Sequence, residues 1–193
     1  KVEHSFEGIE LPFENRGIIV HRKGITEVKK ICDTEGGEIF IGFGSGEIVF
    51  RVGNASLFVR EIDEEYPDYE SVIPVDFTRT VVVEVRELLE GMRRIMPLTD
   101  PNALTVKMEV RPETMILSSA NAQTGFGETS LYADYDGDAF VVGFNQRYLQ
   151  DSAAAIESQQ LSLKMSDADS PCLAEPSDPE EGALYVLMPV EEP

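Results

Sequence analysis

The sequence predicts an α+β protein made of three consecutive β-α-β-β-β repeats. Three amphipathic helical stretches recur at nearly equal spacing and end at Ile31, Ile95 and Ile156, which gives a period of 64 and then 61 residues. A short apolar run precedes each helical stretch, and three β-like runs follow it. A period of this length indicates one supersecondary unit that is used three times.

The elements of each repeat follow from the local sequence pattern. The first repeat has its expected strand, helix and three strands at residues 17–20, 22–31, 38–43, 47–52 and 56–62. The second has them at 81–83, 86–95, 103–110, 114–119 and 125–133. The third has them at 140–142, 145–156, 160–165, 172–175 and 183–188. Residues 161–165 alternate strictly between apolar and polar side chains, as a half-buried strand requires, and the Gly-Ser-Gly of 44–46 favours a hairpin turn.

The first two helical stretches are amphipathic in the same phase. At about 100° per residue, Ile25, Val28 and Ile31 share one face of the first helix, and Leu88 and Met92 share the matching face of the second. The opposite arc carries the basic side chains Arg22, Lys23, Lys29, Lys30, Arg93 and Arg94. We therefore expect basic charge to gather on the outer faces of these two helices. In the third helix only Arg147 is basic.

The composition is that of a folded chain with an unusual charge. Among 193 residues 42% are hydrophobic, while 36 acidic and 16 basic residues give a net charge of −20. A protein wrapped on all sides by nucleic acid, or docked on an anionic membrane, is not expected to carry this charge. No apolar run approaches the roughly 20 residues of a membrane span. The start of the chain lacks an export signal and its two cysteines lie 140 residues apart, so we expect a reduced, cytoplasmic protein without a membrane partner.

Several motifs suggest chemistry but fail on their spacing. Residues 134–138 (Asp-Tyr-Asp-Gly-Asp) resemble a calcium loop, yet glycine stands fourth rather than sixth and Asn145 occupies the position of the final glutamate. Residues 42–46 join two strands and do not open a helix, which argues against a dinucleotide site. His4 and His21 have no Cys or carboxylate in ligand register. The sequence thus predicts no metal, no cofactor and no enzymatic activity.

Four segments together resemble one known family. These are Ser56–Asp63 followed by Tyr66–Pro74, Gly143–Leu149, Ser166–Leu173 and the terminal run Leu184–Val190, with its Leu-Phe strand, Tyr-Pro-Asp-Tyr loop and Tyr-Val-Leu-Met-Pro ending in order. They closely resemble the bacterial DNA polymerase III β subunits, the replicative sliding clamps. The resemblance covers essentially the whole chain.

The resemblance implies a fold, an activity and partners. Members have three similar domains of the DNA clamp fold, each made of two β-α-β-β-β units, and two protomers close head-to-tail into a ring around duplex DNA. The three repeats then represent one and a half domains: residues 1–75 are expected to be the second half of the middle clamp domain, with an exposed apolar face, and residues 76–193 the C-terminal domain. The implied role is that of a non-catalytic processivity factor. Its partners would be duplex DNA without sequence preference, polymerase III α and other polymerases, the clamp loader, repair proteins and a second protomer.

The resemblance also assigns site residues. Arg22 and Lys23 match positions that face DNA, and Arg93 and Arg94 are added because they share the same helical phase. Leu98 and Glu128 match the ring interface, although Pro97 and a thinned acidic stretch depart from the family pattern. The pocket that takes short peptide motifs would be formed by Pro67, Val72, Asn145, Tyr148, Val186, Met188, Pro189 and Val190.

Two departures concern this pocket. Ser71 stands where the family often has an arginine, and Glu191-Glu192-Pro193 replaces a basic residue and a leucine. Because these glutamates follow the pocket run directly, they could alter which peptides are preferred.

One other class of protein fits the acidic composition. An acidic DNA mimic, or a general protein-interaction module, would also carry a net charge near −20. Such a mimic should scatter carboxylates over every helix face, whereas Arg22, Lys23, Lys29 and Lys30 cluster on one. The clustering favours the clamp.

Overall fold

The computed structural model describes residues 2–3, 18–44, 46–66, 68 and 70–190. The chain divides into two compact units, whose described residues are 18–68 (the N-terminal unit) and 70–190 together with 2–3 (the C-terminal unit). The division thus falls after Asp68. The assignment of residues 1–75 and 76–193 to two successive clamp domains stays a prediction.

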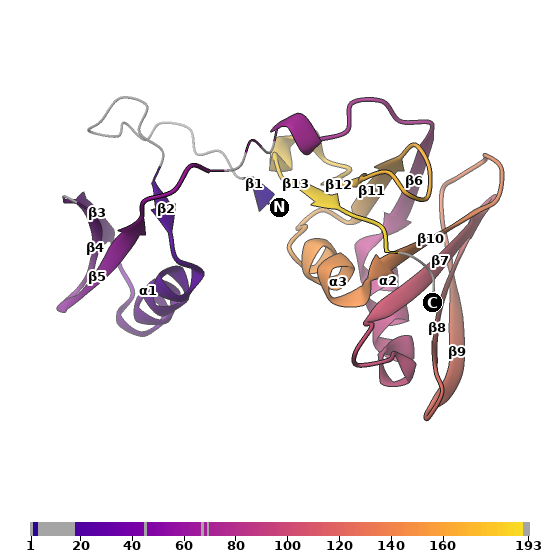
Figure 1. Cartoon of the computed structure of the whole chain (residues 1–193), viewed down its shortest axis with the longest axis horizontal. Helices are drawn as coiled ribbons and strands as arrows, with labels where there is room; N and C mark the ends of the chain where they lie inside the picture. Colours follow the sequence, from indigo (N-terminus) through magenta and orange to yellow (C-terminus); the bar gives the residue numbers. More distant parts are fainter. Residues whose placement is uncertain (1, 4–17, 45, 67, 69, 191–193) are drawn as a thin grey trace. The chain divides into compact units, whose positions relative to one another are not determined.

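The N-terminal unit contains one β-α-β-β-β repeat. Its elements are β2 (Ile19–Val20), α1 (Arg22–Glu35), β3 (Ile39–Phe43), β4 (Glu47–Val52) and β5 (Ala55–Ile62). They form an antiparallel sheet of order β2-β5-β4-β3, against which α1 packs (Figure 1). The helix runs four residues further than expected and ends at Glu35; the C-cap residue Gly36 follows, and its positive φ of 66° favours glycine. Its small core consists of Val28, Ile48, Phe50 and Val59.

The C-terminal unit contains two such repeats. The second repeat of the chain comprises β6 (Arg79–Glu84), α2 (Val85–Ile95), β7 (Thr105–Arg111), β8 (Thr114–Asn121) and β9 (Gly125–Tyr132). The third comprises β10 (Phe140–Asn145), α3 (Gln146–Ala154), β11 (Gln160–Met165), β12 (Cys172–Pro176) and β13 (Leu184–Leu187). Short 3-10 helices lie at Glu70–Val72, Met96–Leu98 (η2) and Pro179–Glu181, and β1 (Val2–Glu3) pairs with β13. The predicted α+β fold with three β-α-β-β-β repeats is confirmed.

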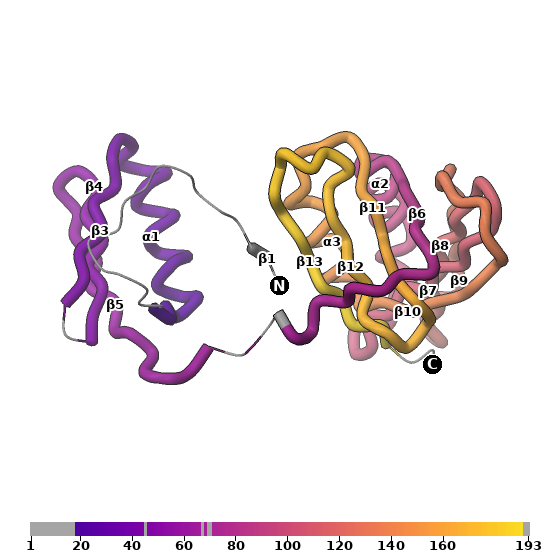
Figure 2. Tube along the Cα trace, turned by 90° about the horizontal axis from the view of Figure 1, so that it is seen from above, coloured from indigo at the N-terminus to yellow at the C-terminus, as the bar shows by residue number. Residues whose placement is uncertain are grey.

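The two repeats of the C-terminal unit exchange their first strands. Strand β10 of the third repeat pairs with β7 of the second, which gives the sheet β10-β7-β8-β9. Conversely, β6 of the second repeat pairs with β11 of the third, in the sheet β1-β13-β12-β11-β6. Helices α2 and α3 pack side by side, with strands of both sheets around them (Figures 1 and 2). Each sheet therefore contains strands from both repeats.

One continuous core fills the space between these layers. The inward side chains Val106, Met108 and Leu117 of one sheet and Leu161 and Leu163 of the other are all fully buried. Alternating burial along β7 and β8 matches the two-residue period of a strand with one face in the core. No helix within the described ranges is long and apolar enough to cross a membrane.

A buried network of hydrogen-bonded polar side chains joins α3 to the end of α2. The Gln146 side-chain amide donates to the Met92 carbonyl (3.1 Å), and its oxygen accepts from the Thr99 hydroxyl (2.6 Å). Ser119 on β8 donates in turn to the Thr99 hydroxyl oxygen (3.1 Å). Gln146, Thr99 and Ser119 are each at least 92% shielded from solvent, so these bonds satisfy groups that water does not reach. This network fixes the first turn of α3 against η2.

Replacing Gln146 with leucine should destabilise the C-terminal unit. The Met92 carbonyl and the Thr99 hydroxyl would both lose a partner in the interior, at a cost of about 1–3 kcal/mol. Urea unfolding followed by circular dichroism measures the change. Gln150→Leu, one turn later on the same helix, is the matched control and should stay within about 0.5 kcal/mol of the parent. Equal stability of the two variants would contradict this account of the network.

Candidate functional site

A cavity of about 540 Å³ lies between α3 and the last strand of the chain. Helix α3 and the end of β10 supply one wall, and β13 with the segment that follows it supplies the other. The lining residues are Phe144, Asn145, Tyr148, Asp151, Ser152, Tyr185, Val186, Leu187, Met188, Pro189 and Val190. The lining is mainly apolar, with a few polar groups, which is typical of a ligand site.

Local hydrogen bonds fix the helix wall of the cavity. Asn145 is the N-cap of α3, and its side-chain oxygen accepts from the backbone N–H groups of Arg147 (3.0 Å) and Tyr148 (3.3 Å). This is why the helix begins at Gln146 and not at 145 as expected. Because Tyr148 and Asp151 are three residues apart, they lie on the same helix face and both reach the cavity.

The opposite wall is tied to β10 beyond the end of β13. The backbone N–H of Val190 donates to the Gly143 carbonyl (2.9 Å). A Cβ atom on Gly143 would lie 2.7 Å from the Val190 carbonyl oxygen, so only glycine permits this close approach. The run Met188-Pro189-Val190 is thereby held beside the start of α3.

Two large apolar side chains of the cavity remain open to solvent. Tyr148 is 65% and Met188 60% exposed, whereas Tyr185 and Leu187 behind them are buried. Methionine adapts its shape to apolar partners, and tyrosine offers an apolar ring with a polar tip. Exposed apolar groups that rest on a buried floor are suited to binding an apolar side chain.

The segment that follows α3 is anchored by the carboxylate of Glu181. Glu181 accepts from the backbone N–H groups of Glu157 (2.8 Å) and Ser158 (2.9 Å). Partial burial raises the pKa of Glu181, but the hydrogen bonds from Glu157 and Ser158 outweigh it and leave the pKa below its usual value. Burial, and then the charge of Glu181, raise the pKa of Tyr185, whose hydroxyl donates to the Ala155 carbonyl (3.4 Å). The floor of the cavity therefore keeps a neutral tyrosine.

The structure brings most of the expected pocket residues together. Six of the eight line this cavity: Asn145, Tyr148, Val186, Met188, Pro189 and Val190. Val72 lies in the 3-10 helix Glu70–Val72, is exposed and does not line it, while Pro67 lies outside the described residues. Sequence reasoning missed Asp151, although its three-residue spacing from Tyr148 was a usable signal.

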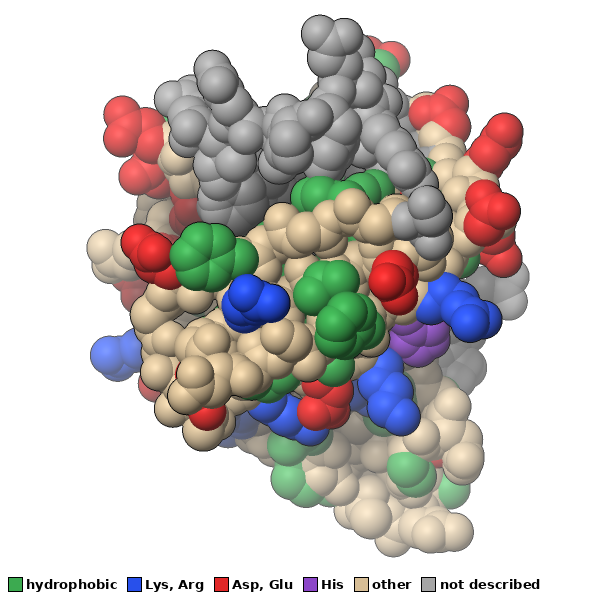
Figure 3. Space-filling view, turned by 90° about the vertical axis from the view of Figure 1, so that its left-hand side faces the viewer, with side chains coloured by type: hydrophobic (Ala, Val, Ile, Leu, Met, Phe, Trp, Pro, Cys, Tyr) green, Lys and Arg blue, Asp and Glu red, His purple; other side chains and the backbone are tan. Residues whose placement is uncertain are grey.

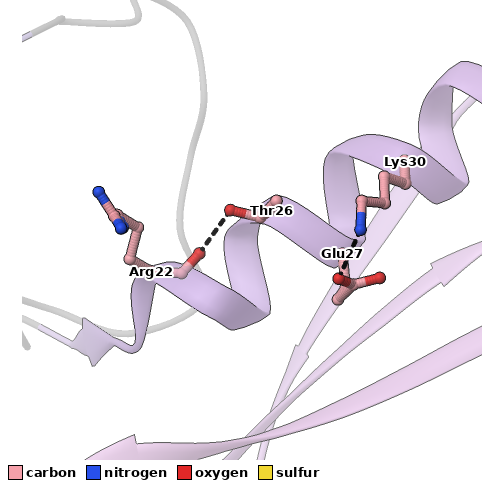
Figure 4. A network of polar contacts seen from close by, with 4 residues as sticks. All are labelled: Arg22, Thr26, Glu27 and Lys30. Carbon is pink, nitrogen blue, oxygen red and sulfur yellow. Dashed lines mark hydrogen bonds and ion pairs between the residues drawn. The ribbon is translucent and has the colours of Figure 1, made fainter.

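The expected DNA-facing side chains are all exposed. Arg22 and Lys23 begin α1, and the Arg22 side chain extends outward from the first turn (Figure 4). Further along this helix, Lys30 pairs with Glu27 (2.8 Å). Arg93 and Arg94 lie in the last turn of α2, and only Arg94 has an ion pair among the described residues, with Glu90 at 3.7 Å.

The two expected interface residues lie at one edge of a sheet. The Leu98 side chain in η2 covers Gly127 of β9 so closely that a Cβ there would collide with Leu98 Cδ1. Glu128 is the next residue of β9 and is exposed. Among the described strands, β9 is an outer strand of its sheet.

In the part of the chain that the structure describes, no three His, Cys, Asp or Glu side chains group as metal ligands.

Both parts of the chain match a known protein family. A family model described as the DNA polymerase III beta subunit, C-terminal domain, matches residues 70–191, and one for the central domain of that subunit matches residues 6–68. The chain belongs to the DNA polymerase III beta subunit family.

Individual relatives agree with this membership. The Beta sliding clamp of Caulobacter vibrioides is 32% identical over 175 residues, which cover 90% of this chain and 46% of the relative. A crystal structure of the C. crescentus beta sliding clamp matches with a TM-score of 0.85 at 31% identity, covering 93% of this chain and 48% of that one. A Bartonella birtlesii clamp bound to griselimycin matches with a TM-score of 0.83 at 29% identity, over 92% and 48% of the two chains. This chain thus spans about half the length of the relatives it matches.

The two cysteines offer a probe of the sheet behind the cavity. Cys172 on β12 pairs in register with Leu187 of β13 and is fully buried, which raises the pKa of its thiol to about 12. Cys32 on α1 is only partly buried. Since the thiolate is the reactive form, Cys172 should be inert while the sheet is intact.

We expect a thiol reagent at pH 8 to modify one thiol per native chain and two after unfolding in guanidinium. Cys32→Ser should reduce the native count to none. Rapid modification of two thiols in the native protein would show that β12 and β13 do not seal Cys172.

Proposed function

We propose that this chain is part of a DNA sliding clamp, the processivity factor of a bacterial replicative polymerase. The clamp encircles duplex DNA as a head-to-tail ring of two protomers and keeps the polymerase on its template. It has no catalytic role and needs no cofactor, and it acts in the cytoplasm. Membership of the beta subunit family supports this role. The single observation that carries it is the apolar cavity beside α3.

In this proposal the cavity binds short peptide motifs of partner proteins. Apolar side chains of the peptide would lie against Tyr148, Met188 and the wall of Pro189 and Val190, which removes apolar surface from water. Pro67 and Val72 belong to the proposed pocket by family resemblance alone. The partners are polymerase III α and other polymerases, the clamp loader and repair proteins, each using one such motif.

The proposed DNA surface consists of Arg22, Lys23, Arg93 and Arg94. A clamp must slide, so contacts to phosphates without base readout suit it. Exposed guanidinium and ammonium groups on these helix faces would provide a weak attraction for phosphates in an otherwise acidic protein. The ring would be completed by contacts of a second protomer with Leu98 of η2 and Glu128 of β9.

A six-residue peptide that starts with glutamine and ends in Leu-Phe tests the pocket. We expect it to bind the 193-residue chain and to shift the NMR signals of residues around Met188 and Tyr148. Met188→Ala removes an apolar contact worth on the order of 1–2 kcal/mol, so the dissociation constant should rise about 5- to 30-fold.

Met96→Ala is the matched control for this titration, because Met96 is also half exposed but lies on η2 and does not line the cavity. It should leave the peptide affinity unchanged. If the peptide shifts no signals near Met188, or if both variants weaken binding equally, the assignment of this pocket is wrong.

Duplex DNA tests the second surface. A few cations on a chain of net charge −20 are screened beyond about 8 Å at physiological salt, so we expect no measurable duplex binding above roughly 0.15 M salt. At low salt we expect at most weak binding without sequence preference in fluorescence anisotropy, and Arg22→Glu with Lys23→Glu should lower any such signal.

The control for the DNA experiment carries the same charge change on strands. Arg51→Glu with Arg60→Glu alters two exposed arginines of β4 and β5 in the same unit and should retain most of the low-salt signal. Equal loss in both double variants would indicate a general charge effect. Tight or sequence-selective binding at physiological salt would contradict the clamp function.

A further inference from the structure

The cavity beside α3 has a single charged side chain in its lining. Among the described residues that line it, Asp151 is the only acidic or basic one. Three of the other polar side chains already bond within the protein. Asn145 caps α3, Ser152 donates to the Leu149 carbonyl (2.9 Å), and the Tyr185 hydroxyl donates to the carbonyl of the C-cap residue of this helix. A preference of the cavity for the charge of its ligand therefore depends on Asp151.

The carboxylate of Asp151 is open to a ligand. Its ion pair with Arg147 spans 3.9 Å to the Nε atom, and the two side chains are 72% and 73% exposed. Such a pair contributes little, because water solvates both charges and two mobile side chains must be ordered. Arg147 does not itself line the cavity. A cation that a ligand brings into the cavity can therefore approach Asp151 without breaking a strong contact.

The stability of α3 does not explain an aspartate at this position. Asp151 begins the last turn of the helix, which ends at Ala154. The carbonyl groups at that end carry partial negative charge, so a carboxylate is unfavourable there, and aspartate is a poor helix former. In the pair with Arg147 the acid lies on the C-terminal side, which is the less favourable order for residues four apart. A residue that opposes its local structure and lines a cavity is a candidate for ligand recognition.

Asp151 lies at one end of the cavity, one helical turn beyond an apolar contact. The helix wall extends from Asn145 to Asp151, about 9 Å at 1.5 Å per residue, and Tyr148 lies halfway along it. The run Met188–Val190 is held beside the start of α3, at the other end. An extended peptide advances about 3.3 Å per residue. When one of its apolar side chains lies on Tyr148, a long side chain on the neighbouring residue can therefore reach Asp151.

We propose that Asp151 selects partner peptides that carry a lysine or an arginine directly beside their apolar residues. The ammonium or guanidinium group pairs with the carboxylate of Asp151 while the apolar side chains cover Tyr148 and Met188. An acidic residue at the same place in the peptide is repelled. This inference rests on the proposed peptide binding and adds a charge preference to it. Apolar contact alone supplies the binding, and Asp151 ranks the peptides that bind.

Two sets of peptides test this preference by calorimetric titration at low salt. Each peptide starts with glutamine and contains Leu-Phe, with glutamine, lysine or glutamate directly before this pair in one set and directly after it in the other. The two placements cover both directions in which a peptide can run along α3. In at least one set, lysine should bind the 193-residue chain about 3- to 10-fold more tightly than glutamine, and glutamate more weakly. In Asp151→Asn, the lysine and glutamine affinities of that set should agree within about 2-fold.

Glu157→Gln is the matched control, because Glu157 follows α3, is exposed and does not line the cavity. A control is needed since the net charge of −20 attracts any cation, and Figure 3 shows acidic side chains scattered over the side that it views. This variant should keep the preference for lysine.

Three results would overturn the proposal. They are equal lysine and glutamine affinities in the parent chain, equal loss of the preference in both variants, and a preference that persists in Asp151→Asn. The last result would assign the preference to other carboxylates, such as Glu191 and Glu192, which follow Val190 in the sequence. If the glutamine peptides bind and only the preference is absent, the proposed pocket stands without a charge selection. If no peptide of either set binds, the pocket itself is wrong and this inference falls with it.

Discussion

The reciprocal exchange of strands β6 and β10 is the constraint on which the rest of the C-terminal unit depends. Each repeat places its first strand in the sheet of the other, so neither repeat closes its core without its neighbour. Val83 and Phe144 are both 1% exposed as a result. Burial of a side chain of this size contributes about 1.5–3 kcal/mol, and two ladders of such side chains hold the repeats together.

The same exchange fixes the walls of the cavity. Strand β10 leads directly into α3, whose first turn carries Asn145 and Tyr148, and Gln146 ties that turn to the end of α2. On the other side, β13 is the continuation of the sheet that β6 enters. Tyr148 and Met188 can therefore remain exposed on a rigid frame, which suits the proposed peptide binding because a preformed surface loses less entropy on binding.

Local patterns predicted the repeats well, because period and amphipathicity are properties of neighbouring residues. The helix at 86–95 and the strand at 160–165 were both found within one residue of their bounds. The exchange itself was not predicted, since pairing of Phe144 with Val106 joins residues that lie far apart in the sequence and leaves no local signal. The Gln146 network was missed for the same reason.

The residues of the candidate sites also differ in the kind of signal that predicted them. Asn145, Tyr148 and Met188 came from motif resemblance, and their meeting at one cavity agrees with it. Arg93 and Arg94 were placed by helical phase, and their exposure follows from that phase alone. Helical phase says nothing about the ligand that meets such a face, so DNA contact at Arg93 and Arg94 stays a proposal.

Native-state amide hydrogen exchange tests most directly whether the exchanged strands make the two repeats one cooperative unit. The amides in the β6·β11 and β10·β7 ladders should exchange through one common opening with the highest free energy in the C-terminal unit, because neither ladder can open while the other stays closed. Exchange of β6 and β11 through a lower-energy opening that leaves β7 and β10 protected would contradict the account, since the two repeats would then be separate structures placed side by side.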